Sequence, residues 1–142
     1  MPDPINLTFS VTNMCQSRCK TCGIWKLYKE DRSRLSQELT LEEIERTFAS
    51  MGRVYFFNIS GGEPFLRKDL PRIVEAAVKY LKPAVIHAPT NAIAPHVVEE
   101  KTAEILEVIE RSGRRIPFTI KPSFDGVWDV HDEIRGVEGN YE

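Results

Sequence analysis

The fold class of this chain is decided by residues 54–64, VYFFNISGGEP. The first seven form an apolar run of strand length, and the glycine pair with Glu63 and Pro64 then predicts a tight turn. A helix is expected next, because Asp69 can cap its start and an apolar face follows at intervals of three and four residues: Leu70, Ile73, Val74, Ala77, Val78 and Leu81. A strand, a turn and a helix in this order predict one unit of an α/β fold.

Strands on both sides of this segment extend the pattern. Apolar and polar residues alternate over residues 6–12, which predicts a strand, and further strands are expected over residues 84–90 and 116–124. The connections between these strands are too long for hairpins. We therefore expect parallel neighbours joined by right-handed crossovers.

Two further helices are expected in these connections. Thr40 and Glu43 match a capping box, and the apolar helical face that follows them ends at Gly52. Pro95 suits the first turn of a helix that reaches Arg111. The resulting order of strands and helices predicts a parallel α/β sheet.

The composition fits one globular unit. The chain has 142 residues, of which 42% are hydrophobic and 28% are charged, enough for one core and too few for two. Its formal net charge of −2 gives no electrostatic reason to expect nucleic acid or an anionic membrane as a partner. The sequence has no positively charged N-terminal leader pattern and no run of about 18 apolar residues. We expect a cytoplasmic protein.

The residues best suited to chemistry all follow predicted strands. In parallel α/β folds, ligands bind at the carboxyl ends of the strands. Three cysteines follow the first strand, the Gly-Gly-Glu-Pro turn follows the second, and polar residues follow the other two. These residues are Cys15, Cys19 and Cys22; Gly61, Gly62, Glu63 and Pro64; Thr90 and Asn91; and Ser123, Asp125 and Gly126. Their shared position predicts one ligand site.

The cysteines lie in the run CQSRCKTC, residues 15–22, and the sequence contains no others. Three clustered thiols argue against a disulfide framework and for a metal site, and thiolates select iron-sulfur clusters or zinc. In a cluster of four irons, three protein sulfurs leave one iron able to bind a molecule from solution. Zinc is the alternative, with His87, His96 or His131 as the fourth ligand.

Cysteines spaced C-x3-C-x2-C after a first strand, with Gly-Gly-Glu-Pro after a second, resemble the radical S-adenosylmethionine (radical SAM) enzymes over essentially the whole chain. The resemblance implies that Cys15, Cys19 and Cys22 hold a [4Fe-4S] cluster whose fourth iron binds the amino and carboxylate groups of SAM. It also implies one-electron reduction by a donor such as flavodoxin or ferredoxin. SAM is then cleaved to methionine and a 5′-deoxyadenosyl radical, which abstracts a hydrogen atom from the substrate.

The same resemblance implies further SAM-binding residues. Gly61 and Gly62 permit close backbone approach, and Glu63 can accept a hydrogen bond from the SAM ammonium group. Residues 123–142 resemble the stretch at and after the fourth strand in members with a cysteine-rich C-terminal SPASM domain, which act on peptides and proteins. The weaker SAM-binding positions are Thr90, Asn91, Ser123 and Arg135. The first three can equally cap turns, and Arg135 can equally pair with Asp132 or Glu133 at the surface.

The family core is usually a partial TIM-like (β/α)6 barrel. With about four strands, residues 1–142 are expected to be the N-terminal portion of that core in a longer protein. The resemblance implies a radical SAM oxidoreductase or transferase, and the C-terminal residues imply peptide or protein modification. Alternatives are biosynthesis of a small-molecule cofactor and a noncatalytic zinc or iron-sulfur module. No side chain is assigned as a catalytic acid or base, and packing is favoured over a general-base role for His131.

Overall fold

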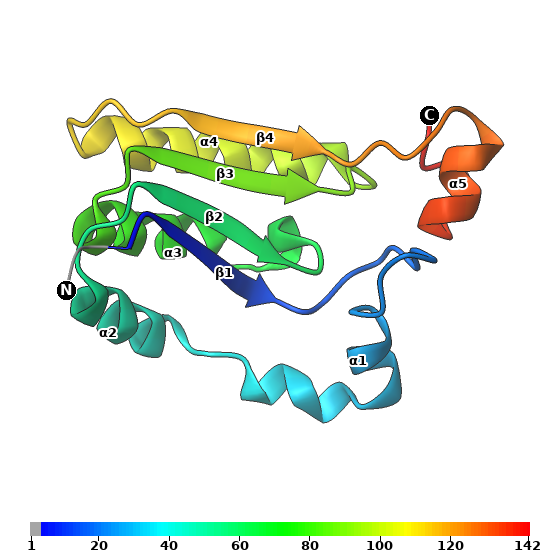
Figure 1. The fold of residues 1–142 in the computed structure, drawn as a ribbon, viewed down its shortest axis with the longest axis horizontal. Coiled ribbons are helices and arrows are strands. Elements are labelled where there is room, and N and C mark those ends of the chain that lie inside the picture. The colour runs from blue at the N-terminus through cyan, green and yellow to red at the C-terminus, as the bar shows by residue number, and fades with distance from the viewer. Residues whose placement is uncertain (1–3) are drawn as a thin grey trace.

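A computed structural model describes residues 4–142 as a four-stranded parallel sheet in the order β1-β2-β3-β4 (Figure 1). The strands are β1 (Asn6–Thr12), β2 (Phe56–Gly61), β3 (Val85–Thr90) and β4 (Phe118–Pro122). The predicted α/β class and parallel sheet are confirmed. Consecutive parallel strands with helical crossovers form an open segment of a TIM-like barrel.

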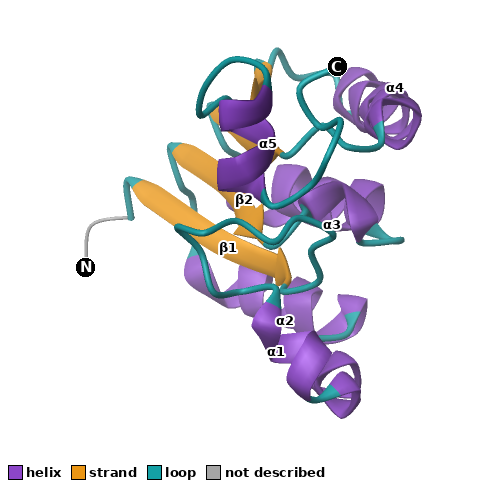
Figure 2. Ribbon diagram, turned by 90° about the vertical axis from the view of Figure 1, so that its right-hand side faces the viewer, coloured by secondary structure: helices purple, strands orange, loops and turns teal. Residues whose placement is uncertain are grey.

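The connections place their helices on one face of the sheet (Figure 2). These helices are α2 (Leu41–Met51), α3 (Leu70–Ala76) and α4 (Pro95–Arg111). The predicted capping box is present, since Thr40 N donates to Glu43 Oε2 at 2.8 Å and Glu43 N donates to Thr40 Oγ1 at 3.3 Å. As predicted, α2 ends at Gly52, which has a φ of 79°.

Two details of the connection between β2 and β3 differ from expectation. The helix predicted over residues 70–81 divides into α3 and a π-helical segment, η3 (Ala77–Leu81). Asp69 makes no side-chain cap, and its carboxylate instead pairs with Arg67. A nearby guanidinium offers a charge-assisted bidentate partner, which is stronger than a single bond to a backbone amide.

Several short helical elements were not predicted, because they are shorter than the window in which hydrophobic periodicity can be recognised. They are α1 (Lys26–Glu30), η1 (Arg32–Gln37), η2 (Pro64–Leu66) and α5 (Asp129–Arg135). Strands β2 and β4 are also shorter than their apolar runs. Val54 and Ile116 are buried, although they lie outside the strands. Their apolar character reflects core packing rather than strand pairing.

The core lies between the sheet and the three covering helices. Phe48 of α2 packs edge-on against Phe9 and Phe57, with ring centroids 5.1 and 5.5 Å away. Edge-to-face packing of this kind adds to the free energy gained by burying the rings. Among residues 4–142, no helix is both long and apolar enough to cross a membrane.

Candidate functional site

The predicted site residues lie at the carboxyl ends of the strands. Gly61 and Thr90 are the last residues of β2 and β3, and Ser123 directly follows β4. The loop carrying the cysteines leaves β1 after Thr12. Helix α5 stands at the same end of the sheet, next to this loop (Figures 1 and 2).

The glycine turn is in close contact with the loop after β1. Gly62 N donates to Thr12 O at 2.8 Å, and Glu63 N donates to Met14 O at 2.7 Å. A Cβ at Gly61 would lie 2.0 Å from Thr12 O, and one at Gly62 would lie 2.2 Å from Met14 O. Gly61 also has a φ of 122°, which other residues rarely adopt. Both glycines are therefore required by the approach of the cysteine loop itself.

The carboxylate of Glu63 is buried and joins two turns. Its Oε2 accepts from Asn91 N at 2.6 Å, and its Oε1 accepts from Phe65 N at 3.2 Å. Burial raises the pKa of Glu63, and the two backbone hydrogen bonds oppose that rise. Each carboxylate oxygen can accept more than one hydrogen bond, so this side chain retains acceptor sites for an ammonium group.

The three cysteines differ in exposure. Cys15 is half-buried, Cys19 is buried and Cys22 is exposed. Cys15 Sγ accepts a hydrogen bond from Asn91 Nδ2 at 3.8 Å, and burial raises the pKa of the Cys15 thiol. Within residues 4–142, no three His, Cys, Asp or Glu side chains converge to hold a single metal ion. A cluster of several irons does not require such convergence, because each thiolate binds its own iron.

Helix α5 anchors the cysteine loop. Arg18 N donates to Arg135 O and Lys20 N donates to Ile134 O, both at 2.9 Å. Gly136 ends α5 with a φ of 67°, and a Cβ there would lie 2.5 Å from Arg18 O. These contacts join segments more than a hundred residues apart in sequence, which is why sequence periodicity did not reveal them.

Four buried side-chain polar atoms in the described part of the chain lack a hydrogen-bond partner, and all four belong to the cysteine loop or to residues at and after the end of α5. They are Gln16 Oε1, Ser17 Oγ, Arg135 Nε and Asn140 Oδ1. Buried polar atoms are nearly always bonded, and an unpaired one costs about 1 to 3 kcal/mol. Their concentration here, beside three thiols, fits a site that a polar ligand and a thiolate-bound metal group would complete.

The weaker SAM-binding candidates take part in the local turns. Thr90 Oγ1 accepts from Ala92 N at 3.0 Å, and Asn91 Oδ1 accepts from Ile93 N at 3.1 Å. Ser123 N donates to Thr90 O at 2.8 Å. Thr90 and Asn91 therefore make the turn-capping contacts that the sequence allowed as the alternative to SAM binding. Only the amide nitrogen of Asn91 also reaches a cysteine.

Arg135 and His131 contact partners that the sequence did not indicate. Arg135 Nη1 pairs with Asp125 Oδ2 at 3.1 Å, so the ion pair with Asp132 or Glu133 that was the alternative to a SAM-binding role is not the one formed. His131 is buried, and its Nδ1 accepts from Asp125 N at 3.2 Å. The sequence-based preference for a packing role of His131 agrees with this environment.

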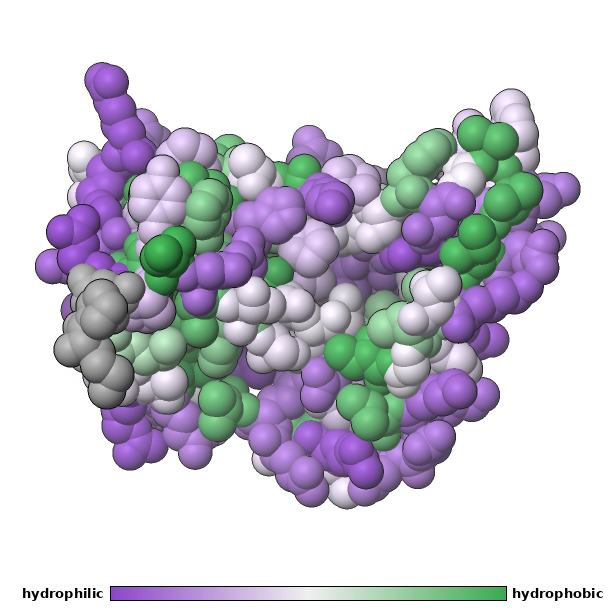
Figure 3. All heavy atoms as spheres, in the orientation of Figure 1, coloured by the Kyte–Doolittle hydropathy of each residue, from purple (hydrophilic) through white to green (hydrophobic). Residues whose placement is uncertain are grey.

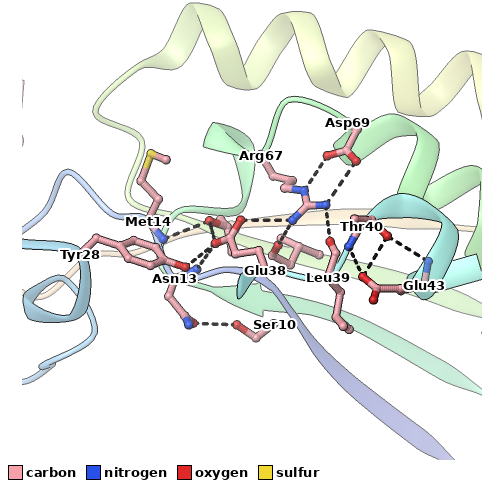
Figure 4. A network of polar contacts seen from close by, with 12 residues as sticks. Ser10, Asn13, Met14, Tyr28, Glu38, Leu39, Thr40, Glu43, Arg67 and Asp69 are labelled. Carbon is pink, nitrogen blue, oxygen red and sulfur yellow. Dashed lines mark hydrogen bonds and ion pairs between the residues drawn. The ribbon is translucent and has the colours of Figure 1, made fainter. Parts of the chain in front are cut away.

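A polar network that the sequence analysis missed supports the start of the cysteine loop (Figure 4). Glu38 accepts from Thr12 Oγ1 at 2.6 Å, Asn13 N at 3.1 Å, Tyr28 OH at 2.7 Å and Arg67 Nη1 at 3.2 Å. Burial acts to raise the pKa of Glu38, but these donors outweigh it and hold the pKa below its usual value. Burial and the bond to Glu38 raise the pKa of Tyr28 to about 12. Because its partners come from three separate segments of the chain, no local sequence pattern identifies Glu38.

Comparison with known protein families gives one extended match. The model of the radical SAM superfamily matches residues 9–142, which include every residue of the predicted site.

The curated relatives of this chain include proteins named GTP 3′,8-cyclase or probable GTP 3′,8-cyclase. The chain is 43% identical over 72 residues to a probable GTP 3′,8-cyclase of Archaeoglobus fulgidus, covering 49% of this chain and 22% of that protein. It is 41% identical over 73 residues to the Acidothermus cellulolyticus enzyme, covering 49% and 20%. It is 33% identical over 144 residues to the Pasteurella multocida enzyme, covering 96% and 41%. The chain thus spans between a fifth and two fifths of the length of these relatives.

Proposed function

The chain belongs to the radical SAM superfamily, and from this membership we propose that its carboxyl-edge site supports reductive cleavage of SAM and hydrogen-atom abstraction from a substrate. Proteins of this superfamily use a [4Fe-4S] cluster and SAM. The observation that carries the proposal is the gathering of the four unpartnered buried atoms beside the cysteine loop. A protein does not gain by leaving such atoms unpaired, and a bound ligand would satisfy them.

In this proposal Cys15, Cys19 and Cys22 each bind one iron, and the fourth iron is left to the amino and carboxylate groups of SAM. When bound and reduced, the cluster supplies the electron that cleaves SAM to methionine and a 5′-deoxyadenosyl radical. Asn91 donates to the Cys15 sulfur, and a hydrogen bond to a ligating sulfur tunes the potential of a cluster. The half-buried Cys15 must lose its thiol proton to bind iron, since the thiolate is the ligand.

Glu63 and Arg135 have complementary roles in the proposed SAM site. The buried carboxylate of Glu63 accepts from the SAM ammonium, and its bonds to Asn91 N and Phe65 N hold it in place. Arg135 offers its unpartnered Nε as a donor, while its ion pair with Asp125 fixes the guanidinium. Thr90 and Ser123 contribute by shaping the adjoining turns. An electron donor such as flavodoxin or ferredoxin completes the proposed system.

The substrate has two candidate classes. Peptide or protein modification, expected from the resemblance of residues 123–142, has no support among the named relatives. Their shared name favours the alternative class of small molecules, because GTP is a small molecule. We therefore place a small-molecule reaction of oxidoreductase or transferase type ahead of peptide modification.

Anaerobic iron-sulfur reconstitution followed by electron paramagnetic resonance (EPR) of the dithionite-reduced chain tests this proposal. A [4Fe-4S]⁺ signal that shifts on addition of SAM is expected. Cys15→Ala, Cys19→Ala and Cys22→Ala should each lose the cluster absorption, because three ligands leave no replacement. Thr21→Ala is the matched control, since it changes the exposed residue between two cysteines and leaves the thiols intact. A full cluster in all three cysteine variants, or tight zinc binding with no cluster, would contradict the proposal.

A further inference from the structure

The segment that contains the three cysteines is positively charged, although the chain as a whole is not. Residues 15–34 contain six lysine and arginine side chains and two acidic ones, whereas the whole chain has a formal net charge of −2. Arg18, Lys26 and Lys29 are exposed, and none of them forms an ion pair in the described part of the chain. Unpaired positive charge therefore adjoins the proposed cluster site.

Trp25 connects two of these lysines with a predicted cluster ligand. Lys26 Nζ and Lys29 Nζ each lie 5.6 Å from the centroid of the Trp25 ring, a distance at which the ring attracts a cation. The two lysines are three positions apart on α1, so they project from the same side of this short helix. Trp25 itself is partly buried, and its Nε1 donates to Cys19 O at 3.3 Å. We call Arg18, Lys26 and Lys29, together with the Trp25 ring, the basic surface.

Cys22 is the exposed member of the three cysteines and lies close to the basic surface. It precedes Trp25 by three residues, so the two Cα atoms are at most about 11 Å apart even in an extended chain. Cys22 N donates to Cys19 O at 3.3 Å, and this is the carbonyl oxygen that also accepts from Trp25 Nε1. A cluster bound through Cys22 would therefore come close to solvent beside the Trp25 ring and the lysines.

Acidic side chains border the basic surface without neutralising it. Glu133 of α5 pairs with Lys20, and Asp31 pairs with Arg34 at 3.8 Å. Glu30, at the end of α1, is exposed and is one carboxylate against three cations. Figure 3 shows strongly hydrophilic residues along the lower right rim of the molecule, where Figure 1 places α1 and the segment that follows it.

We propose that the basic surface docks a small acidic electron-transfer protein, which reduces the cluster. One electron passes from the reduced carrier to the cluster, so the carrier is oxidised and the cluster is reduced by one electron. The cations stand exposed on a loop and a short helix, which gives a small anion no enclosure, whereas an acidic protein surface can meet all three. The inference rests on the proposed function, because it takes the three cysteines to hold a [4Fe-4S] cluster.

The size and charge of the basic surface suit such a partner. Electron-transfer complexes are weak and bury less than about 1,200 Å² in total, so they do not need an extended apolar interface. Opposite charges speed the encounter of two proteins and orient them as they meet. Docking beside Cys22 would bring the carrier to the side on which the cluster is least covered by protein.

The test compares reduction of the cluster-containing chain by a protein donor and by an uncharged chemical donor. The probes are flavodoxin hydroquinone and photoreduced 5-deazariboflavin, and the loss of cluster absorbance gives the rate. In Lys26→Glu/Lys29→Glu, the second-order rate constant with flavodoxin should fall about tenfold or more at low salt, because charge steering contributes at least that factor to association. The rate with 5-deazariboflavin should not change. With the wild-type chain, the flavodoxin rate should fall as salt is added.

Lys79→Glu/Lys82→Glu is the matched control, since it makes the same change in net charge at two exposed lysines three positions apart. These lysines lie just before β3, at the opposite end of the sheet from the cysteines, and Lys79 Nζ likewise lies near an aromatic ring, 4.7 Å from the Tyr80 centroid. The control should keep the wild-type rate with flavodoxin. Lys26→Arg/Lys29→Arg should also keep it, which separates the effect of charge from packing on Trp25.

A binding measurement gives a readout that does not depend on catalysis. Isothermal titration calorimetry with oxidised flavodoxin should show weaker binding to Lys26→Glu/Lys29→Glu than to the wild-type chain, by about the factor lost in the rate. If the glutamate variant binds less iron than the wild-type chain, Lys26→Gln/Lys29→Gln and the salt dependence of the wild-type rate decide the question instead.

Three results would overturn the inference. They are an unchanged flavodoxin rate when both lysines of α1 are reversed, an equal loss in the Lys79→Glu/Lys82→Glu control, and a wild-type rate that does not depend on salt. Failure of the proposed function is distinguishable, because it appears as a missing SAM-dependent shift in the EPR spectrum of the dithionite-reduced chain, a measurement that involves no protein donor.

Discussion

The helix-covered face of the sheet and the carboxyl edge of the same sheet are stabilised by different interactions, although they lie only a few residues apart along each strand. On the covered face, Phe57, Ile59 and Leu70 are almost completely buried among other apolar side chains. At the edge, the cysteine loop is held by backbone hydrogen bonds to α5 and adjoins buried polar atoms without partners. Apolar burial is non-directional and sums over many contacts. The scaffold is therefore expected to be stable by itself, and the edge to gain stability from its ligands.

The largest expected effect is in the core. Phe57→Ala should destabilise the chain by about 3 to 5 kcal/mol, because it removes a fully buried ring that packs on Phe48 and leaves a cavity. Urea denaturation followed by circular dichroism measures this loss. Phe56→Ala is the matched control, since the neighbouring ring is 39% exposed and lies on the other face of the strand. Equal losses in the two variants would remove the contrast between a packed and an open face.

A change in the glycine turn is expected to lower stability less than Phe57→Ala does, but to lower iron binding more. Gly62→Ala should destabilise the chain by about 1 to 3 kcal/mol, because the new Cβ would lie 2.2 Å from Met14 O and displace the cysteine loop. After reconstitution, the iron bound per chain should fall by a larger fraction of the wild-type value than the urea midpoint of unfolding does. Gly23→Ala is the control, since a Cβ there meets nothing within 4 Å. Unchanged iron content in Gly62→Ala would show that the loop tolerates displacement.

The smallest expected effect is at the polar network beside the loop, and it depends on pH. Glu38→Gln should cost about 1 to 2 kcal/mol at pH 7, because the hydrogen bonds from Thr12, Tyr28 and Arg67 lose their charged acceptor. The folded-state pKa of Glu38 lies below its unfolded value, so its stabilisation is present above the unfolded pKa and is lost as pH falls through the folded pKa.

Urea midpoints between pH 7 and pH 3 measure this dependence. The difference between the wild-type chain and Glu38→Gln should shrink toward acid pH, while Glu30→Gln, at an exposed position, should match the wild type throughout. A difference that grows toward acid pH would mean that the sign of the linkage is wrong.

Elements with a strong local signal were predicted well, and those fixed by distant partners were not. The strand Asn6–Thr12 and the capping box of α2 are predictable because apolar alternation and capping residues are patterns of neighbouring positions in the sequence. The short helix α5 was missed, as was its contact with the cysteine loop, because that contact joins residues more than a hundred positions apart. The position of Asp69 predicts a helix cap, and no local pattern indicates that Arg67 pairs with its carboxylate instead.

The sequence by itself determined the α/β class, the positions of the strands and the grouping of the unusual residues at strand ends, because hydrophobic periodicity and turn chemistry act over a few residues. It also indicated the family, through the spacing of three cysteines and the turn Gly61–Pro64. Only the tertiary structure decided that Glu38 supports the loop, that Asp125 pairs with Arg135, and that Thr8, Asn58, His87 and Thr119 form one row. Those relations depend on strand register and long-range packing, which fix distances between segments that share no local pattern.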